Sequence, residues 1–188
     1  MAEIRLARAG DGARVRDVML AAFEEYRAFA LPSSALDESL ADVERAVARG
    51  GALIVVDGGR DVGSVRFEVP EALRAQVATA WEREREAAPM PKESQTRARD
   101  RVHDGALGFA RLAVVPDARG RGIGAAIIAR LESLAISLAL GAVEITVRSQ
   151  QPDNRPYYER LGYEVTGYGE RYGVGDLVTK MRKVLAPR

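Results

Sequence analysis

The stretch that decides the fold is residues 114–125, VVPDARGRGIGA. A mostly apolar run over residues 106–115 leads into it, and apolar residues recur along one helical stripe over residues 123–138. The stretch therefore joins a strand to the first turn of a long helix. The unpaired amides of that turn and the helix dipole attract an anion, and glycines allow a phosphate to approach the backbone. Because Arg119 and Arg121 add positive charge, we expect a diphosphate to bind there.

Several kinds of glycine loop can stand between a strand and a helix. A P-loop is excluded because no Gly-Lys-Ser/Thr follows the glycines. The dinucleotide-binding fingerprint is matched literally by Gly120, Gly122 and Ala125, with Glu144 as an acidic residue about 20 positions on. Glu144 falls early in the next strand, however, and too few residues follow Gly124 to complete a doubly wound domain. Glycines that serve only helix–strand packing are the other alternative, although three within five positions weaken a helix start.

The amino-acid composition argues against several classes of function. The chain has 188 residues, the size of one domain, and its 28 basic and 27 acidic residues leave a net charge of +1. That balance argues against nucleic-acid binding through bulk charge. The chain contains no cysteine, which excludes disulfides, thiolate metal sites and cysteine nucleophiles. His103 is the single histidine, so a multi-histidine metal site is excluded and we expect no metal.

The N-terminus and the apolar segments predict where the protein resides. Residues 1–5 lack the apolar core of a signal peptide. The longest nearly apolar stretch, residues 134–143, is far shorter than the roughly 20 residues that span a bilayer. We therefore expect a soluble, cytoplasmic protein with no membrane partner.

Hydrophobic periodicity predicts alternating strands and helices. We expect strands at residues 3–8, 52–56, 62–69, 106–115, 142–148, 163–172 and 176–185. We expect helices from an Asp11 cap to about residue 26, from a Ser34–Asp37 start to Gly50, and at residues 73–86, 121–140 and 154–161, with Gly141 ending the fourth. The strand–helix–strand at 106–148 should be a right-handed crossover between parallel strands. One α/β domain over residues 1–188, with a solvated insertion at about 70–105, is therefore predicted.

Two motifs together resemble a known family. Arg119-x-x-Gly122-x-Gly124, after a strand that ends in Leu112-Ala113-Val114, resembles the acetyl-CoA pyrophosphate loop of the GNAT superfamily of acetyltransferases. Residues 157–163, YYERLGY, match that family's aromatic-Tyr-x-x-x-Gly-Phe/Tyr signature at the expected distance. The order of the expected elements is also similar, and the resemblance covers nearly all of the chain except about residues 70–105. It implies a GNAT-like fold, a central and mostly antiparallel sheet with one parallel crossover, flanked by helices.

The resemblance implies acetyl-CoA as the cofactor and assigns residues to it. The backbone of Leu112, Ala113 and Val114 would pair with the pantetheine arm like an added strand, and one of their amides would polarise the thioester carbonyl. The loop and the first helical turn would hold the pyrophosphate, and the residues concerned are Arg119, Gly120, Arg121, Gly122, Ile123, Gly124 and Ala125.

Tyr158 is the candidate general acid. It matches the position that in many family members lies near the thioester sulfur and protonates the leaving thiolate. A neutral phenol with a pKa of about 10 suits that task. Packing on the short helix is the alternative for Tyr158 and the preferred interpretation for Tyr157.

Many members also carry an asparagine seven residues before the tyrosine. Here that residue is Gln151, and Asn154 either contacts the cofactor or caps the short helix.

Direct attack by an amine on the acetyl group requires a neutral amine. For a lysine-like amine with a pKa of ~10.4, deprotonation at pH 7 costs roughly 4–5 kcal/mol, which is large enough to need a base. Some members place a glutamate on the strand before the loop, but residues 106–115 contain no carboxylate. Glu68, at the end of the preceding strand, is the substitute, with an ordinary surface glutamate as the alternative. His103 is a second candidate, because its pKa would suit a base, with an ordinary loop residue near the end of the insertion as the preferred alternative.

The acceptor is expected to be a small-molecule amine in preference to a protein amine. Glu24, Glu25 and Tyr26 are candidates for lining the acceptor cleft. The acidic side chains of Glu24, Glu25 and Glu68 weakly favour a cationic amine as the acceptor. A catalytically silent CoA-binding module is the alternative function, favoured by the missing strand carboxylate. A nicotinamide-dependent oxidoreductase is a further alternative function. The resemblance also suggests a homodimer.

Overall fold

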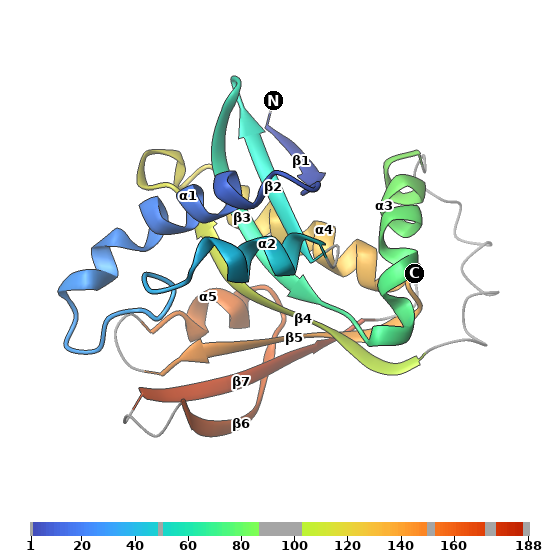
Figure 1. The fold of residues 1–188 in the computed structure, drawn as a ribbon. Helices are drawn as coiled ribbons and strands as arrows, with labels where there is room; N and C mark the ends of the chain where they lie inside the picture. The colour runs from blue at the N-terminus through green and yellow to red at the C-terminus, as the bar shows by residue number, and fades with distance from the viewer. Residues whose placement is uncertain (1, 49–50, 87–102, 150–152, 172–175, 186–188) are drawn as a thin grey trace.

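A seven-stranded sheet runs through the molecule in the order β1-β2-β3-β4-β5-β7-β6 (Figure 1). The computed structural model describes residues 2–48, 51–86, 103–149, 153–171 and 176–185. The strands are β1 (Glu3–Leu6), β2 (Ala52–Asp57), β3 (Arg60–Glu68), β4 (His103–Val114), β5 (Leu140–Arg148), β6 (Glu164–Arg171) and β7 (Asp176–Val184). Strands β4 and β5 are parallel, and every other pair of neighbours is antiparallel. The predicted mixed sheet with one parallel crossover is therefore confirmed.

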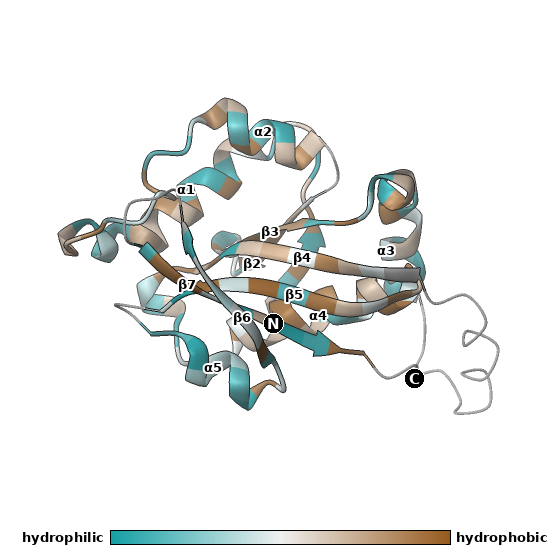
Figure 2. Ribbon diagram, turned by 90° about the horizontal axis from the view of Figure 1, so that it is seen from below, coloured by the Kyte–Doolittle hydropathy of each residue, from teal (hydrophilic) through white to brown (hydrophobic). Residues whose placement is uncertain are grey.

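Helices cover both faces of the sheet. They are α1 (Gly12–Phe23), continued by the 3₁₀ turn η1 (Glu24–Ala28), α2 (Leu40–Ala48), η2 (Glu71–Gln76), α3 (Val77–Glu86), η4 (Pro116–Ala118), α4 (Ile123–Ser137) and α5 (Arg155–Arg160). Figure 2 shows α1 and α2 on one side of the sheet and α4 and α5 on the other. Within the described ranges, no helix has the length and apolar character that a membrane span requires.

The pleat of β3 divides its side chains between the two faces. Val65 and Phe67 are buried in the main hydrophobic core, which α4 also supplies with its apolar stripe. Ser64 points the other way, because its hydroxyl donates a hydrogen bond to the Val15 carbonyl of α1 at 3.3 Å. Arg66, two residues on, shares that face with Ser64. The α1 side of the central strands therefore carries polar side chains.

Strand β4 bends away from β5, and this divergence positions the site. The β4–β5 ladder is paired as far as Phe109 and Ile145, although β4 runs on to Val114 and β5 to Arg148. Figure 1 shows the two strands separating beyond that point. A β-bulge accompanies the bend, because the pairing with β3 shifts register and Arg111 has a φ of +57°. The sheet is therefore open between the ends of its two parallel strands.

The second helix begins later than the sequence predicts. The Ser34–Asp37 segment forms a turn, and α2 starts at Leu40. The capping box lies at Ser39 and Asp42: the Ser39 hydroxyl accepts from the Asp42 N–H at 3.2 Å, and the Asp42 carboxylate accepts from the Ser39 N–H at 3.3 Å. The predicted start is wrong because two such motifs follow one another and the second one caps the helix.

The described part of the predicted insertion is not a solvated segment. Leu73, Val77, Ala80 and Trp81 are all buried and belong to the main core. The Arg130 guanidinium of α4 lies 4.6 Å from the centroid of the Trp81 ring, a cation–π contact. Helix α3 is thus a packed part of the domain. Residues 87–102 lie outside the described residues.

Other helix boundaries differ by a few residues. Helix α4 ends at Ser137, and the left-handed residue behind it is Ala139, with a φ of +57°, whereas the predicted stop Gly141 already lies in β5. Asp11 does stand at the N-cap of α1, but its carboxylate makes no cap bond. Instead it accepts hydrogen bonds from the Arg5 guanidinium at 2.7 and 2.9 Å.

Candidate functional site

The glycine loop exposes the first amides of α4. Gly120 and Gly122 have φ values of +73° and +77°, a left-handed conformation that favours glycine. The Gly122 carbonyl accepts from the Ala126 N–H at 2.9 Å, which is the first hydrogen bond of the helix. The N–H groups of Ile123 and Gly124 come before that bond and have no acceptor inside the helix. The loop therefore presents main-chain donors at a positive helix end.

These donors line a cavity of about 360 Å³, here named the loop cavity. It gathers almost all of the predicted cofactor residues, namely Leu112, Ala113, Val114, Arg119, Gly120, Gly122, Ile123, Gly124, Ala125 and Asn154. The exception is Arg121, which does not line the cavity and whose guanidinium is paired with Asp57 at 2.5 Å. The Arg121 side chain therefore does not bring the expected positive charge to the loop cavity.

The Arg119 side chain ties the loop to the end of α1. Its guanidinium donates to the Glu25 carboxylate at 3.0 Å, to the Ala22 carbonyl at 2.9 Å and to the Val114 carbonyl at 3.1 Å. Glu25 neutralises its charge. Arg119 therefore fixes the shape of the loop, and the main-chain amides are the donors left for an anion.

Tyr157 takes part in the loop cavity, which sequence reasoning missed. A Cβ at Gly124 would lie 2.9 Å from the Tyr157 hydroxyl, so the glycine makes room for that group. The Tyr157 side chain is about half-buried and lines the cavity, and burial raises its pKa. The third glycine of the loop was the available signal, because close approach of a partner is one reason for glycine in a helix.

Tyr158 lines the loop cavity and is almost fully buried. It is 6% exposed, and its ring packs against those of Phe109 and Tyr163, with centroids 6.1 and 5.9 Å away. Burial is the main cause that raises the pKa of its hydroxyl, and the neighbouring phenol of Tyr157 adds to it. The phenol is therefore neutral at ordinary pH.

A second cavity of about 900 Å³, here named the sheet cavity, lies over the polar face of the central strands. Its floor comes from β3, β4 and β5 and includes Arg66, Glu68, Gly108, Ala110, Glu144, Thr146 and Arg148. The two cavities share Phe23, Tyr26, Leu112, Asn154 and Tyr158, and they meet at these residues. The opening between β4 and β5 thus joins the glycine loop to the open face of the sheet.

The other predicted residues fall into three groups. Glu68 lies on the floor of the sheet cavity, exposed and without an ion pair or side-chain hydrogen bond to any described residue. Tyr26 lines both cavities, whereas Glu24 is paired with Arg27 and lines neither. His103 is the first residue of β4, at the far end of the strand from Val114.

Asn154 lies where the two cavities meet. Asn154 stands at the N-cap of α5, but its side chain makes no cap bond. It lies instead beside the Tyr26 hydroxyl and lines both cavities. Gln151, the residue at the family's usual asparagine position, lies outside the described residues.

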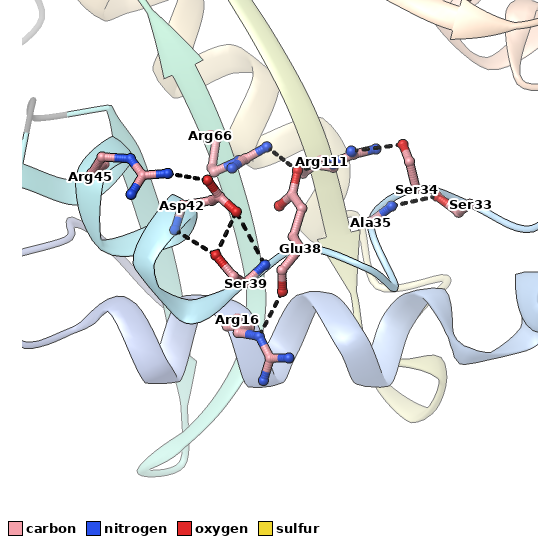
Figure 3. A network of polar contacts seen from close by, with 10 residues as sticks. All are labelled: Arg16, Ser33, Ser34, Ala35, Glu38, Ser39, Asp42, Arg45, Arg66 and Arg111. Atoms are coloured by element: carbon pink, nitrogen blue, oxygen red, sulfur yellow. Dashed lines mark hydrogen bonds and ion pairs between the residues drawn. The ribbon is translucent and has the colours of Figure 1, made fainter. Parts of the chain in front are cut away.

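An arginine cluster at the wall of the sheet cavity was not predicted (Figure 3). Glu38, in the segment before α2, accepts from Arg66 of β3 at 2.6 Å and from Arg111 of β4 at 2.9 Å. Arg111 also donates to the Ser34 hydroxyl at 3.0 Å. Arg148 of β5 donates to the Leu31 carbonyl at 2.7 Å. No local pattern reveals these contacts, because the partners are 28 to 117 residues apart along the chain.

Comparisons with known proteins agree with this geometry. Residues 93–185 match the family model described as acetyltransferase (GNAT) domain. None of the curated protein sequences compared with the chain matched it. Among solved structures, a polyamine N-acetyltransferase of Drosophila melanogaster is 17% identical, with a TM-score of 0.65 and coverage of 98% of this chain and 100% of that one. These likenesses are too distant in sequence to show more than a common fold.

Two further solved structures contain the cofactor. The PaiA N-acetyltransferase of Thermoplasma acidophilum, in complex with coenzyme A, is 13% identical, with a TM-score of 0.66 and coverage of 98% and 99%. The yncA protein of Salmonella typhimurium, solved with its cofactor acetyl-CoA, is 18% identical, with a TM-score of 0.60 and coverage of 100% and 96%. These two structures show the common fold, and the family match carries the assignment of acetyl-CoA as the cofactor. The chain carries a GNAT acetyltransferase domain over residues 93–185 and is an acetyl-CoA-dependent acetyltransferase.

Proposed function

We propose that this acetyltransferase transfers the acetyl group directly to the amine of a small molecule, with Tyr158 as proton donor to the leaving sulfur. The observation that carries the proposal is the place of Tyr158, which lines both the loop cavity and the sheet cavity where they meet. The sheet cavity, at about 900 Å³, has the size of a small-molecule site.

The loop cavity offers the groups that acetyl-CoA requires. The main-chain donors of Gly120 through Ala125 would hold the pyrophosphate, to which Arg121 contributes its backbone only, because Asp57 holds its side chain. The edge of β4 from Leu112 to Val114, which β5 leaves unpaired, would accept the pantetheine arm. Asn154, at the junction of the cavities, lies where the end of that arm would arrive.

When bound, acetyl-CoA supplies a thioester whose carbonyl carbon is attacked by the amine and whose sulfur leaves as a thiolate. Tyr158 holds a proton for that sulfur at any assay pH below about 10, because burial raises its pKa above the usual phenol value. Proton transfer from a positioned side chain is worth about 10²–10⁴-fold in rate. A main-chain amide of the β4 bulge, next to Leu112, would polarise the carbonyl.

Glu68 is the proposed acceptor of the amine proton, directly or through water. Its carboxylate lies on the floor of the sheet cavity and no described residue pairs with it, so it remains free to take up a proton. The other floor glutamate, Glu144, is held by Arg182 at 2.6 Å.

The test measures CoA release from acetyl-CoA with a panel of amines, for the native protein and Tyr158→Phe. The exposed Tyr168 of β6, which is 70% exposed, provides the matched control Tyr168→Phe. We expect kcat to fall about 100-fold or more in Tyr158→Phe and to stay unchanged in the control. Undiminished turnover by Tyr158→Phe would refute the role of the phenol. Tight binding of CoA without turnover of any amine would instead support a silent binding module.

A further inference from the structure

We infer that Tyr157 is a cofactor-binding residue, and that its hydroxyl donates a hydrogen bond to the pyrophosphate of acetyl-CoA. The inference concerns the cofactor alone and does not depend on the proposed acceptor or on Tyr158 as proton donor. The sequence favours packing as the role of Tyr157, and packing alone is the alternative that the experiment tests.

The Tyr157 hydroxyl lies against the first turn of α4. A Cβ at Gly124 would be 2.9 Å from the hydroxyl oxygen, and the nearest atom of another residue is a methyl carbon of Val114 at 4.0 Å. Helices α4 and α5 lie on the same side of the sheet (Figure 2). The Gly124 N–H is one of the amides without an acceptor inside α4. A phosphate oxygen bound by these amides would therefore lie beside the hydroxyl.

The hydroxyl is free to bind a ligand. Among the residues that the structure describes, none forms a hydrogen bond with it. It is not one of the unpartnered polar atoms that lack accessible surface, and the Tyr157 side chain lines the loop cavity. A ligand in the loop cavity can therefore reach the hydroxyl without displacing another protein group.

The Tyr157 ring is held in place before the cofactor binds. It packs against the main hydrophobic core and meets the Tyr158 ring edge-on, with the two centroids 5.2 Å apart. The Tyr157 N–H donates to the Asn154 carbonyl at 3.1 Å in the first turn of α5. A donor that is already positioned loses little conformational freedom on binding, so its hydrogen bond contributes more to affinity.

The loop cavity has to bind an anion with neutral donors. None of its described lining residues is acidic, and Arg119, its one lining arginine among them, is paired with Glu25 at 2.9 Å. The pyrophosphate therefore depends on main-chain amides and on hydroxyls. Burial raises the pKa of Tyr157, so the phenol keeps its proton and brings no negative charge toward the phosphates.

The experiment measures ligand affinity by calorimetry for the native protein, Tyr157→Phe and the control Tyr168→Phe. Tyr168 is 70% exposed on β6 and lines neither cavity. The three ligands are CoA, 3′-phospho-ADP, which has the pyrophosphate without the pantetheine arm, and pantetheine, which has the arm without phosphates. Displacement by CoA measures the ligands that bind weakly.

We expect Tyr157→Phe to bind CoA and 3′-phospho-ADP about 10- to 100-fold more weakly, because a hydrogen bond to a charged acceptor is lost. Its affinity for pantetheine should be unchanged, and Tyr168→Phe should match the native protein for all three ligands. The Tm of ligand-free Tyr157→Phe should stay at the native value, because the removed hydroxyl has no partner in the free protein.

Two results would overturn the inference. Native affinity of Tyr157→Phe for CoA and 3′-phospho-ADP would leave packing as the role of Tyr157. A loss of affinity for CoA and pantetheine, but not for 3′-phospho-ADP, would place the hydrogen bond on the arm instead of the pyrophosphate. Neither result bears on the proposed amine acetylation, because the measurement contains no amine and no turnover.

Discussion

Replacement of Gly122 by alanine tests the conformation of the glycine loop. Gly122 has a φ of +77° and a ψ of +4° at the N-cap of α4, and an added Cβ would have no atom within 4 Å. The cost of Gly122→Ala is therefore purely conformational, about 1–2 kcal/mol for an L-residue in the left-handed region. Reduced freedom of the unfolded chain returns about 0.4–1 kcal/mol. We expect a net loss of up to about 1.6 kcal/mol and, at about 2–4 °C per kcal/mol for this chain length, a drop in Tm of up to roughly 6 °C.

The effect on CoA should be larger than the effect on stability. If the loop relaxes to a negative φ, the donors ahead of Ala126 turn away from the phosphate, and each charge-assisted hydrogen bond lost weakens binding by about tenfold or more. Calorimetry with CoA and a melting curve measure the two effects on one sample.

Gly108→Ala is the matched control for this variant. An added Cβ at Gly108 also has no atom within 4 Å, but its φ is not positive and it lies in the sheet cavity. We expect unchanged CoA affinity and equal or slightly higher Tm, because alanine is favoured over glycine inside a strand. If Gly122→Ala bound CoA as tightly as Gly108→Ala, the loop would not hold the phosphates through these amides, and the reasoning would fail.

Three further results are expected. Burial raises the pKa of Tyr158, so its hydroxyl keeps its proton as the pH rises. The kcat of the native enzyme should therefore show no alkaline loss due to Tyr158 below about pH 10. A fall in kcat near pH 8 that is absent from Tyr158→Phe would contradict this. The hydrogen bond from Arg5 holds the pKa of Asp11 well below its usual range, so Asp11 stabilises the fold above pH ~4 and progressively less below it. Asp11→Asn should therefore lower the free energy of unfolding by about 1.5–3 kcal/mol at pH 7 and by less at pH 3, as measured by urea unfolding. Trp81→Ala should cost about 3–5 kcal/mol, whereas a value under 0.5 kcal/mol would restore the solvated insertion.

The sequence predicts those features that depend on neighbouring residues. The glycine loop, its helix and the Tyr158 signature each occupy a short continuous stretch, and the structure brings the loop and Tyr158 to one cavity. The hairpins β2–β3 and β6–β7 and the crossover from β4 to β5 also follow, because each joins strands that are consecutive along the chain, whereas the place of β7 between β5 and β6 does not. Burial in α3 was missed because the abundant charges of residues 82–86 hide the apolar face that Val77 and Trp81 supply.

Long-range ion pairs limited the prediction of the site. Arg119 was expected to face a phosphate, yet Glu25, 94 residues away along the chain, takes its charge. Each side chain had many possible partners among 28 basic and 27 acidic residues, and nothing local selects one. The residues that carry the main-chain donors do line the loop cavity, because helix geometry alone determines where those donors point.

A single irregularity in β4 connects the two halves of the site. The extra residue of the bulge bends β4 away from β5, which leaves the edge at Leu112 to Val114 unpaired for the cofactor arm. The same bulge places Arg111, in a strained conformation, against Glu38 on the wall of the sheet cavity. A regular strand would close the opening to the loop cavity and turn the Arg111 side chain to another direction. The strain at Arg111 is therefore offset by its hydrogen bonds to Glu38 and Ser34, and we expect cofactor binding and acceptor binding to be energetically coupled through the bulge.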